Sequence, residues 1–189
     1  YKMLKYGVRD NILNVIQFMY ANLKSRVKYN SGLSEDFSCM LGVAQGECLS
    51  PFLFSMYLND LEETFVLNGY EGVDIGMLKL CLIIYADDLI VFLDTDHGLQ
   101  SGLNILQEYC KKWKLTVNTE KTKILIFKKG GRQARNVIFT FDSKEIEVLS
   151  KFNYLGIIFS TGGSFADTHN ALSGQAIKAI YKLKSYLHK

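Results

Sequence analysis

Two adjacent aspartates, Asp87 and Asp88, lie in the middle of the otherwise apolar stretch LIIYADDLIVF (82–92). An ionised carboxylate in an apolar interior is costly unless it is paired, hydrated or bound to a metal. In an extended strand the two side chains would point to opposite faces. At the tip of a tight hairpin both can leave the core, and aspartate is a favoured turn residue. We therefore predict a hairpin with the acidic pair at its bend.

The residues of this bend leave two interpretations open. The pair can be an ordinary Asp-Asp turn, or it can hold Mg²⁺, which takes carboxylate oxygens, keeps several waters and is completed by substrate phosphates. Two such ions about 4 Å apart can activate an attacking hydroxyl and stabilise a leaving pyrophosphate. The small side chain of Ala86 would leave room for a polynucleotide end to approach.

Sequence patterns on either side of this bend predict the elements that position it. Apolar residues at helical spacing predict a helix over 8–27, and alternation around a central Asn-Ser-Gly predicts two short strands over 25–37. A loop at 42–51 precedes a helix over 52–68, which Ser50 caps and Gly69 stops. The apolar runs 78–85 and 89–93 predict two central strands covered on both faces.

The second half of the chain alternates between short strands and two helices. We expect an amphipathic helix from about His97 to Trp113, capped by Asp96, and a last helix over 166–188. Between them the patterns predict a turn at 118–121, a strand ending near Phe127, a loop at 130–135, and three short strands broken at 142–143 and 150–151. The expected fold class is α+β, a small antiparallel sheet packed by two or three helices.

Composition excludes several classes of protein. With 48% hydrophobic and 22% charged residues among 189, the chain is globular rather than disordered. The net charge is +3, so any nucleic-acid surface must come from local clustering of basic residues. The longest apolar run, 77–93, contains three charged residues and is shorter than the roughly 20 residues of a membrane span. Four cysteines without C-x-x-C spacing predict reduced structural thiols, no zinc and a reducing intracellular compartment.

Four motifs in a fixed order carry a family resemblance. They are GVAQGECLSPFLF (42–54), YADD (85–88), NTEKT (118–122) and FNYLG (152–156). Each motif alone is weak, but the set covers nearly all of the chain and resembles the reverse transcriptases of non-LTR (LINE-type) retrotransposons. An intron-encoded or RNA-copying palm polymerase fits the hairpin too, but fits FNYLG and NTEKT less well.

The resemblance implies a right-hand polymerase palm and the start of a helical thumb. Residues 1–162 would be a partial palm without the fingers and the first catalytic strand, and 163–189 would begin the thumb or connection helix. The implied activity is that of an RNA-directed DNA polymerase, a nucleotidyltransferase that uses two Mg²⁺ ions, with Mn²⁺ as a substitute. Implied partners are an RNA template, a DNA primer, dNTPs, and the endonuclease and other domains of a parent polyprotein. The family implies the nucleus and cytoplasm, and no membrane.

The resemblance also assigns roles to matching positions. Asp87 would be the main metal ligand, Asp88 a weaker or second one, and Lys121 a charge support or proton donor near the triphosphate. The remaining assignments follow as two groups. Gln45, Gly46, Tyr85 and Ala86 would line the nucleotide and template pocket, and Tyr154, Leu155 and Gly156 would form the hairpin that grips the primer end. An ordinary loop, a solvated turn lysine and simple core packing are the competing interpretations of Gln45–Gly46, Lys121 and Tyr154–Leu155.

Basic residues outside these motifs predict weaker phosphate contacts. Lys178 and Lys182 lie one helical turn apart, and a basic loop contains Lys128, Lys129, Arg132 and Arg135. Such side chains can meet phosphates and make binding salt-dependent, although most charged runs are simply solvated.

Two departures from the family pattern limit the expected activity. The family's further metal-binding aspartate lies in an upstream block, and Asp10 does not match it. We therefore expect the 189 residues alone not to polymerise. Glu47-Cys48 also stands where relatives often have Cys-Pro, which adds a negative charge near the template path. The alternative to an active enzyme is an inactive retrotransposon remnant that acts at most as a nucleic-acid-binding or structural piece.

Overall fold

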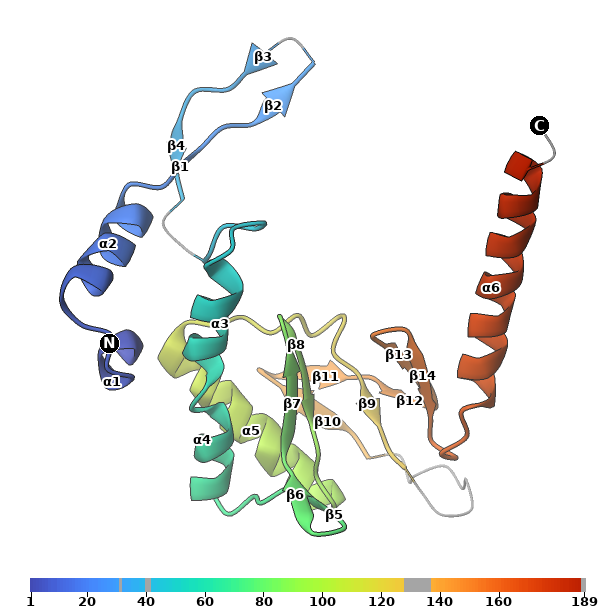
Figure 1. Cartoon of the computed structure of the whole chain (residues 1–189). Coiled ribbons are helices and arrows are strands. Elements are labelled where there is room, and N and C mark those ends of the chain that lie inside the picture. The colour runs from blue at the N-terminus through green and yellow to red at the C-terminus, as the bar shows by residue number, and fades with distance from the viewer. Residues whose placement is uncertain (31, 40–41, 128–136, 188–189) are drawn as a thin grey trace. The chain divides into compact units, whose positions relative to one another are not determined.

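The computed structural model describes residues 1–30, 32–39, 42–127 and 137–187. The chain divides into two compact units, Tyr1–Phe92 and Leu93–Lys189, and each is described by itself. Figure 1 traces the elements of both units along the chain. Helices and small two-stranded ladders alternate, which agrees with the predicted mixture of helix and antiparallel strand.

The described residues of the first unit form four helices where two were predicted. They are α1 (Lys2–Lys5), α2 (Asp10–Ala21), α3 (Ser50–Leu58) and α4 (Leu61–Leu67). The prediction of one helix over 8–27 is wrong at its end. The backbone N–H and the side-chain amide of Asn22 both donate to the Phe18 carbonyl, at 3.3 and 2.8 Å, and end α2 there.

The predicted helix over 52–68 is interrupted at residues 59–60. The Lys2 ammonium donates to the Tyr57 carbonyl and lies 2.6 Å from Asp60 Oδ1, so α1 binds to the chain at this break. The predicted apolar stripe nevertheless packs on both sides of the break. Its buried members are Leu58, Leu61 and Phe65, the last two no more than 1% exposed. Gly69, with φ +86°, ends the second helix as predicted.

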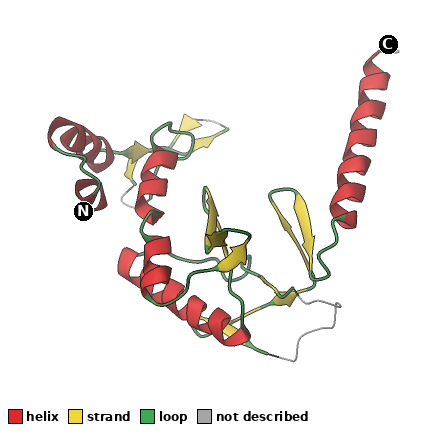
Figure 2. Ribbon diagram, turned by 60° about the horizontal axis from the view of Figure 1, so that its bottom comes forward, coloured by secondary structure: helices red, strands yellow, loops and turns green. Residues whose placement is uncertain are grey.

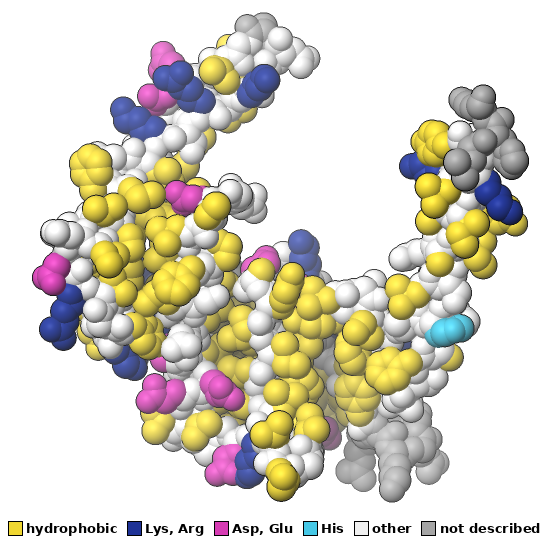
Figure 3. Space-filling view, in the orientation of Figure 1, with side chains coloured by type: hydrophobic (Ala, Val, Ile, Leu, Met, Phe, Trp, Pro, Cys, Tyr) yellow, Lys and Arg dark blue, Asp and Glu magenta, His cyan; other side chains and the backbone are white. Residues whose placement is uncertain are grey.

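A ribbon of four short strands follows α2, and we call it the arm (residues 24–38). In it, β1 (Lys24–Ser25) pairs with β4 (Phe37–Ser38), and β2 (Lys28–Tyr29) pairs with β3 (Gly32–Leu33). This confirms the predicted strand pair over 25–37. Lys and Arg side chains gather along the arm in Figure 3.

Two hairpins complete the first unit. They are β5 (Val73–Ile75) with β6 (Leu78–Leu80), and β7 (Leu82–Tyr85) with β8 (Asp88–Val91). The apolar run 78–85 is therefore not one strand, because Cys81 divides it between the two hairpins. Strands covered on both faces were also wrongly predicted, because Ile83 and Ile84 are 38% and 39% exposed. Among the described residues every ladder has two strands, rather than forming the expected single small sheet.

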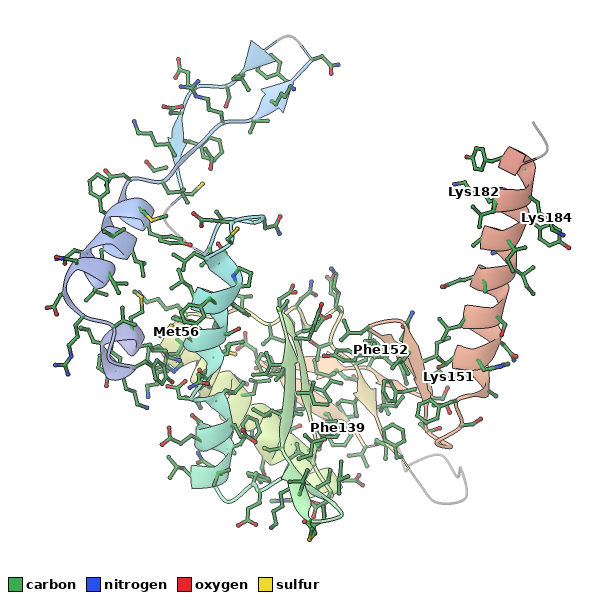
Figure 4. All side chains as sticks on the ribbon, viewed as in Figure 1. Met56, Phe139, Lys151, Phe152, Lys182 and Lys184 are labelled. Atoms are coloured by element: carbon green, nitrogen blue, oxygen red, sulfur yellow. The ribbon has the colours of Figure 1, made fainter. Side chains whose placement is uncertain are left out.

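The core of the second unit forms between α5 (Asp96–Trp113) and the hairpin of β10 (Phe139–Phe141) and β11 (Lys144–Ile146). Thr95 rather than Asp96 caps α5, since Thr95 Oγ1 accepts from the Gly98 N–H at 3.0 Å. The side-chain amide of Gln100 donates through Nε2 to the Thr140 carbonyl and accepts at Oε1 from the Thr140 N–H, each at 2.9 Å. The apolar side chains buried in this unit include Leu106, Tyr109, Phe139, Phe141 and Ile146; Phe139 is labelled in Figure 4.

The remaining elements of the second unit lead to a long terminal helix. Strand β9 (Ile124–Leu125) runs parallel to β12 (Val148–Leu149), and β13 (Lys151–Tyr154) pairs antiparallel with β14 (Ile157–Ser160). Helix α6 (Ala166–Leu187) follows, as Figure 2 shows. Thr168 Oγ1 bonds both the N–H and the carbonyl of Ile158, at 2.8 and 3.0 Å, and so ties the start of α6 to β14. The described residues after 136 thus form five strands where the sequence patterns predicted three. The patterns did not indicate the break at 147, and the reversal at 155–156 was implied only by the family resemblance.

Candidate active site

The acidic pair lies at the tip of the β7–β8 hairpin, which confirms the predicted bend. Tyr85 pairs with Asp88, so Ala86 and Asp87 form a two-residue turn. Ala86 has φ +51° and Asp87 does not have a positive φ. A positive φ at the first turn residue alone is the pattern of a type II′ turn, which normally places glycine there. Ala86 therefore holds a backbone conformation that is strained for a residue with a Cβ atom.

Both carboxylates of the pair face solvent. Asp87 and Asp88 are exposed, and none of the ion pairs among the described residues involves either of them. Four consecutive cross-strand pairs form a regular ladder that ends at Tyr85 and Asp88, and Asp87 lies in the turn that this ladder supports. The pair can therefore offer carboxylate oxygens to a ligand that approaches the tip.

The donor set of this tip fits a hard divalent cation in part. Within the described ranges no group of three or more His, Cys, Asp or Glu side chains could hold a metal ion. Mg²⁺ is commonly bound by one or two carboxylates, with waters and substrate phosphates supplying the other oxygens. Asp87 and Asp88 match that partial ligand set.

Gln45 and Gly46 form an exposed turn four residues before α3 begins. Gly46 has φ +84°, and a Cβ atom added there would meet nothing within 4 Å. Glycine is therefore required at position 46 by the backbone conformation and not by close packing within this chain. A Gly-containing loop before the helix was predicted correctly, and contact of this loop with a nucleotide stays a prediction.

Glu47 connects this turn to two other segments, through partners that the sequence did not suggest. Tyr20 Oη donates to Glu47 Oε2 at 2.9 Å, and Ser50 Oγ donates to the same oxygen at 3.1 Å. Ser50 is the first residue of α3 and not its cap, because its hydroxyl bonds Glu47 instead of the helix backbone. Tyr20 comes from α2, far away in the sequence, and no local pattern marks it as a partner.

Lys121 lies in a turn that Asn118 organises. The Lys121 N–H donates to the side-chain and backbone oxygens of Asn118, at 3.1 and 3.2 Å. The N–H and hydroxyl of Thr122 both donate to the Asn118 carbonyl, each at 2.9 Å. The Asn-x-x-Lys-Thr spacing is thus explained by the turn, which leaves the Lys121 side chain exposed.

Tyr154, Leu155 and Gly156 form the turn of the β13–β14 hairpin, as the resemblance implied for a hairpin here. Leu155 and Gly156 have φ +49° and +85°, the pattern of a type I′ turn. The competing interpretation, that these side chains pack in the core, is wrong for Leu155, which is 52% exposed; Tyr154 is half-buried. The contact of this turn with a primer stays a prediction.

The predicted phosphate-binding residues divide between described and undescribed parts of the chain. Lys178 and Lys182 are exposed on α6. Lys182 and Lys184 project from different sides of this helix in Figure 4. The basic loop residues Lys128, Lys129, Arg132 and Arg135 lie outside the described residues.

The candidate residues therefore form two sets, one in each unit. The first unit contains the acidic hairpin tip and the Gln45–Gly46 turn. The second contains Lys121, the 154–156 turn and the α6 lysines. No helix in the described ranges combines the length and apolar character that crossing a membrane would need.

Comparison with known proteins matches residues 2–159 to the family described as reverse transcriptase (RNA-dependent DNA polymerase). The R2DM retrotransposable element polyprotein of Drosophila melanogaster is 29% identical over 84% of this chain and 15% of its own length. The type-1 retrotransposable element R2 polyprotein of Nasonia vitripennis is 26% identical over 79% of the chain and 15% of its own length. A probable RNA-directed DNA polymerase from transposon BS of Drosophila melanogaster is 26% identical over 97% of the chain and 20% of its own length. The chain thus spans a fifth or less of these relatives.

Proposed function

The chain belongs to the reverse transcriptase (RNA-dependent DNA polymerase) family, and from this we propose that its parent protein copies an RNA template onto a DNA 3′ end. The family match covers most of the chain, and relatives named after retrotransposable elements confirm the resemblance to retrotransposon reverse transcriptases. The observation that carries the proposal is the pair of exposed carboxylates at the rigid tip of the β7–β8 hairpin.

The acidic tip would hold the catalytic metal ions, with Asp87 as the main ligand and Asp88 as a weaker or second one. Bound there, two Mg²⁺ ions, or Mn²⁺ in their place, would activate the primer 3′ hydroxyl and stabilise the leaving pyrophosphate. The hairpin itself presents both side chains away from the apolar strands, where triphosphate oxygens and water can reach them. Tyr85 and Ala86, beside the pair, would line the nucleotide and template pocket together with Gln45 and Gly46.

Lys121 would act on the triphosphate from the Asn118 turn. The Lys121 N–H donates to two oxygens of Asn118, so the backbone from which the lysine side chain extends is held in place. A lysine in this position supports the negative charge of the triphosphate or gives a proton to pyrophosphate as it leaves.

The second unit would also contact the nucleic acid. The exposed turn of Tyr154, Leu155 and Gly156 would grip the primer end, and Lys178 and Lys182 would meet phosphates. In this assignment residues 1–162 form part of the palm, and 163–189 begin the thumb. The RNA template, DNA primer, dNTPs and further domains of the parent polyprotein, an endonuclease among them, are its partners, in the reducing nucleus and cytoplasm.

An inactive remnant remains the alternative function. Among the described residues, the pair is not part of a group of three or more His, Cys, Asp or Glu side chains that could hold a metal ion. The 189-residue chain alone is accordingly expected to make no primer-extension product with an RNA template and Mg²⁺. Product from the chain alone would show that its ligand set is complete.

The test of the proposal is primer extension by the full parent reading frame, with the wild type compared with Asp87→Ala. We expect the variant to lose about a hundredfold or more of the rate, because even an indirect partner of a metal ligand contributes 10- to 100-fold. Asp94→Ala, in the exposed segment after the hairpin, is the matched control and is expected to keep its activity. Equal product from wild type and Asp87→Ala would remove Asp87 from the chemistry.

A further inference from the structure

Three segments of the first unit meet at one carboxylate, that of Glu47. Tyr20 of α2 and Ser50 of α3 both donate to its Oε2 atom, and the Tyr20 and Ser50 hydroxyl oxygens lie 3.3 Å apart. The backbone of Glu47 is held as well, since its carbonyl accepts from the Ser50 N–H at 3.3 Å. Glu47 is thus anchored through its side chain and its main chain at the same time.

The surroundings of this cluster favour a persistent network over a solvated surface contact. Ser50 is only 5% exposed, and Tyr20 and Glu47 are half-buried. Burial raises the pKa of Tyr20, so its hydroxyl stays protonated and can donate throughout the working pH range of an enzyme. Hydrogen bonds to an ionised acceptor are about twice as strong as those between neutral groups.

The turn next to this cluster has few other supports. Gln45 and Gly46 are exposed, and the space where a Cβ atom of Gly46 would stand is open. Packing among the described residues therefore does little to hold the turn in place, whereas the adjoining Glu47 accepts two side-chain hydrogen bonds.

We propose that Glu47 is a positioning residue of the polymerase, whose carboxylate anchors the Gln45–Gly46 turn to α2 and α3 and so presents Gln45 to the incoming nucleotide. The inference rests on the proposed function and assigns a role to the position at which this chain departs from the Cys-Pro of many relatives. The neutral amide introduced by Glu47→Gln would keep an oxygen acceptor for both hydroxyls, whereas Glu47→Ala would remove that acceptor.

The first test is steady-state kinetics of Glu47→Ala and Glu47→Gln in the parent polymerase. We expect Glu47→Ala to raise the KM for dNTP about tenfold and to change kcat less than about threefold. The reason is that Gln45 would no longer be held where it contacts the bound nucleotide in the ground state. Glu47→Gln should restore the KM to within about twofold of wild type. Glu108→Ala, at an exposed helical glutamate that pairs with Lys111, is the matched control.

The second test removes the donor instead of the acceptor. Tyr20→Phe should also raise the KM for dNTP. The Glu47→Ala/Tyr20→Phe double variant should have the same KM as Glu47→Ala alone, because both changes remove the Tyr20–Glu47 hydrogen bond. A KM for Glu47→Ala within about twofold of wild type, whatever its stability, would overturn the proposal. Additive effects of the two changes would overturn it as well.

A third measurement separates this inference from the proposed function. In the 189-residue chain, the NMR order parameters of the backbone N–H groups at residues 42–47 should be lower in Glu47→Ala than in wild type, with those of β7 and β8 unchanged. An inactive wild-type parent would contradict the proposed function, but the order parameters would still decide whether Glu47 anchors the turn. Unchanged order parameters at 42–47 would show that it does not.

Discussion

At the scale of single residues, two of the predicted motifs each contain a strained backbone position. Ala86 and Leu155 hold positive φ angles at the tips of their hairpins, where Gly or Asn would be relaxed. Asp10, Lys114, Asp142 and Ser143 also have positive φ angles but lie outside the motifs, so strain by itself does not mark a functional position. Glu47, which looked like a mere extra charge in the sequence, is hydrogen-bonded to two hydroxyl groups.

The four cysteines differ in environment, and this leads to a prediction of reactivity. Burial raises the pKa of the Cys81 and Cys110 thiols, which are 2% and 7% exposed, whereas Cys48 is exposed. Because the thiolate is the reactive species, a thiol reagent at pH 8 should label Cys48 in the folded chain and leave Cys81 and Cys110 intact.

Mass spectrometry of labelled peptides checks this result, and labelling in denaturant is the control that makes all four thiols available. Fast modification of Cys81 or Cys110 without denaturant would contradict their place in the core. It would also remove the basis for treating them as small apolar side chains that fill the interior.

At the scale of elements, the hairpin turns decide which side chains stand at the tips. The β10–β11 hairpin turns at Asp142 and Ser143, with φ +50° and +61°, and it has the same type I′ pattern as the turn at Leu155 and Gly156. Asp is favoured at such a position and Leu is not. Leu155 is therefore retained at a cost in stability.

Leu155→Asn tests whether that cost serves primer contact. We expect it to stabilise the chain by roughly 0.5–1 kcal/mol, since Asn tolerates the left-handed conformation, and to weaken primer binding by the parent enzyme. Asp142→Asn is the matched control in the other type I′ turn and should change neither quantity. Thermal unfolding and the KM for primer measure the two effects. A destabilised Leu155→Asn variant would mean that Leu155 is held by packing instead.

The junction of α1 with the break between α3 and α4 depends on a buried ion pair. The side chains of Lys2 and Asp60 are only 5% and 14% exposed. Lys2→Ala leaves a buried carboxylate uncompensated and should destabilise folding by about 3 kcal/mol. Lys5→Ala is the matched control: its ammonium is exposed and lies 3.6 Å from Glu63 Oε2, and its loss should cost less than about 1 kcal/mol.

Denaturant unfolding of the two lysine variants supplies the comparison. The double variant Lys2→Ala/Asp60→Ala should recover part of the loss, because it removes the stranded charge along with its partner. Equal stability of Lys2→Ala and Lys5→Ala would mean that α1 is not anchored at the break.

At the scale of the whole molecule, many large apolar side chains of the described residues are exposed. Helix α2 has no buried residue, and an apolar groove of about 340 Å³ lies along it, lined by Ile12, Val15, Ile16, Met19 and others. Along α6, Ile177, Ile180 and Leu183 are more than half exposed, and hydrophobic atoms are visible along this helix in Figure 3. A chain that spans a fifth or less of its relatives agrees with such faces being covered in a longer protein.

Helix α6 also carries the prediction that belongs to this scale, namely the salt dependence of nucleic-acid binding. The slope of log K against log[salt] is negative when cations are released on binding. If Lys178 and Lys182 each neutralise one phosphate, replacing either by Gln should reduce the magnitude of this slope by about 1. Lys184→Gln is the matched control, because Lys184 projects from a different side of α6 than Lys182. A filter-binding titration of the parent protein on primer–template at several salt concentrations measures the slopes. Identical slopes for all three variants and wild type would exclude phosphate contacts at Lys178 and Lys182.

Local patterns predicted the elements best where they depend on neighbours in the sequence. The acidic bend, the turn at 118–121, the helix over 97–113 and the last helix all follow from turn residues and apolar spacing, and all are present. The stop of α2 at Ala21 and the break at 59–60 were missed. At the break the Tyr57 carbonyl and the Asp60 carboxylate bind Lys2, which lies more than fifty residues away along the chain.

The features of the candidate site also divide into those that depend on neighbouring residues and those that depend on distant segments. The sequence alone determined the family, the four motifs and the acidic pair, because those are properties of residue type, order and spacing. Only the tertiary structure decided that the predicted bend is a type II′ turn, that Asn118 builds the lysine turn, and that Tyr20 and Ser50 meet at Glu47. Backbone strain and hydrogen bonds between distant segments depend on where the chain returns in space, and no local pattern of side chains records that.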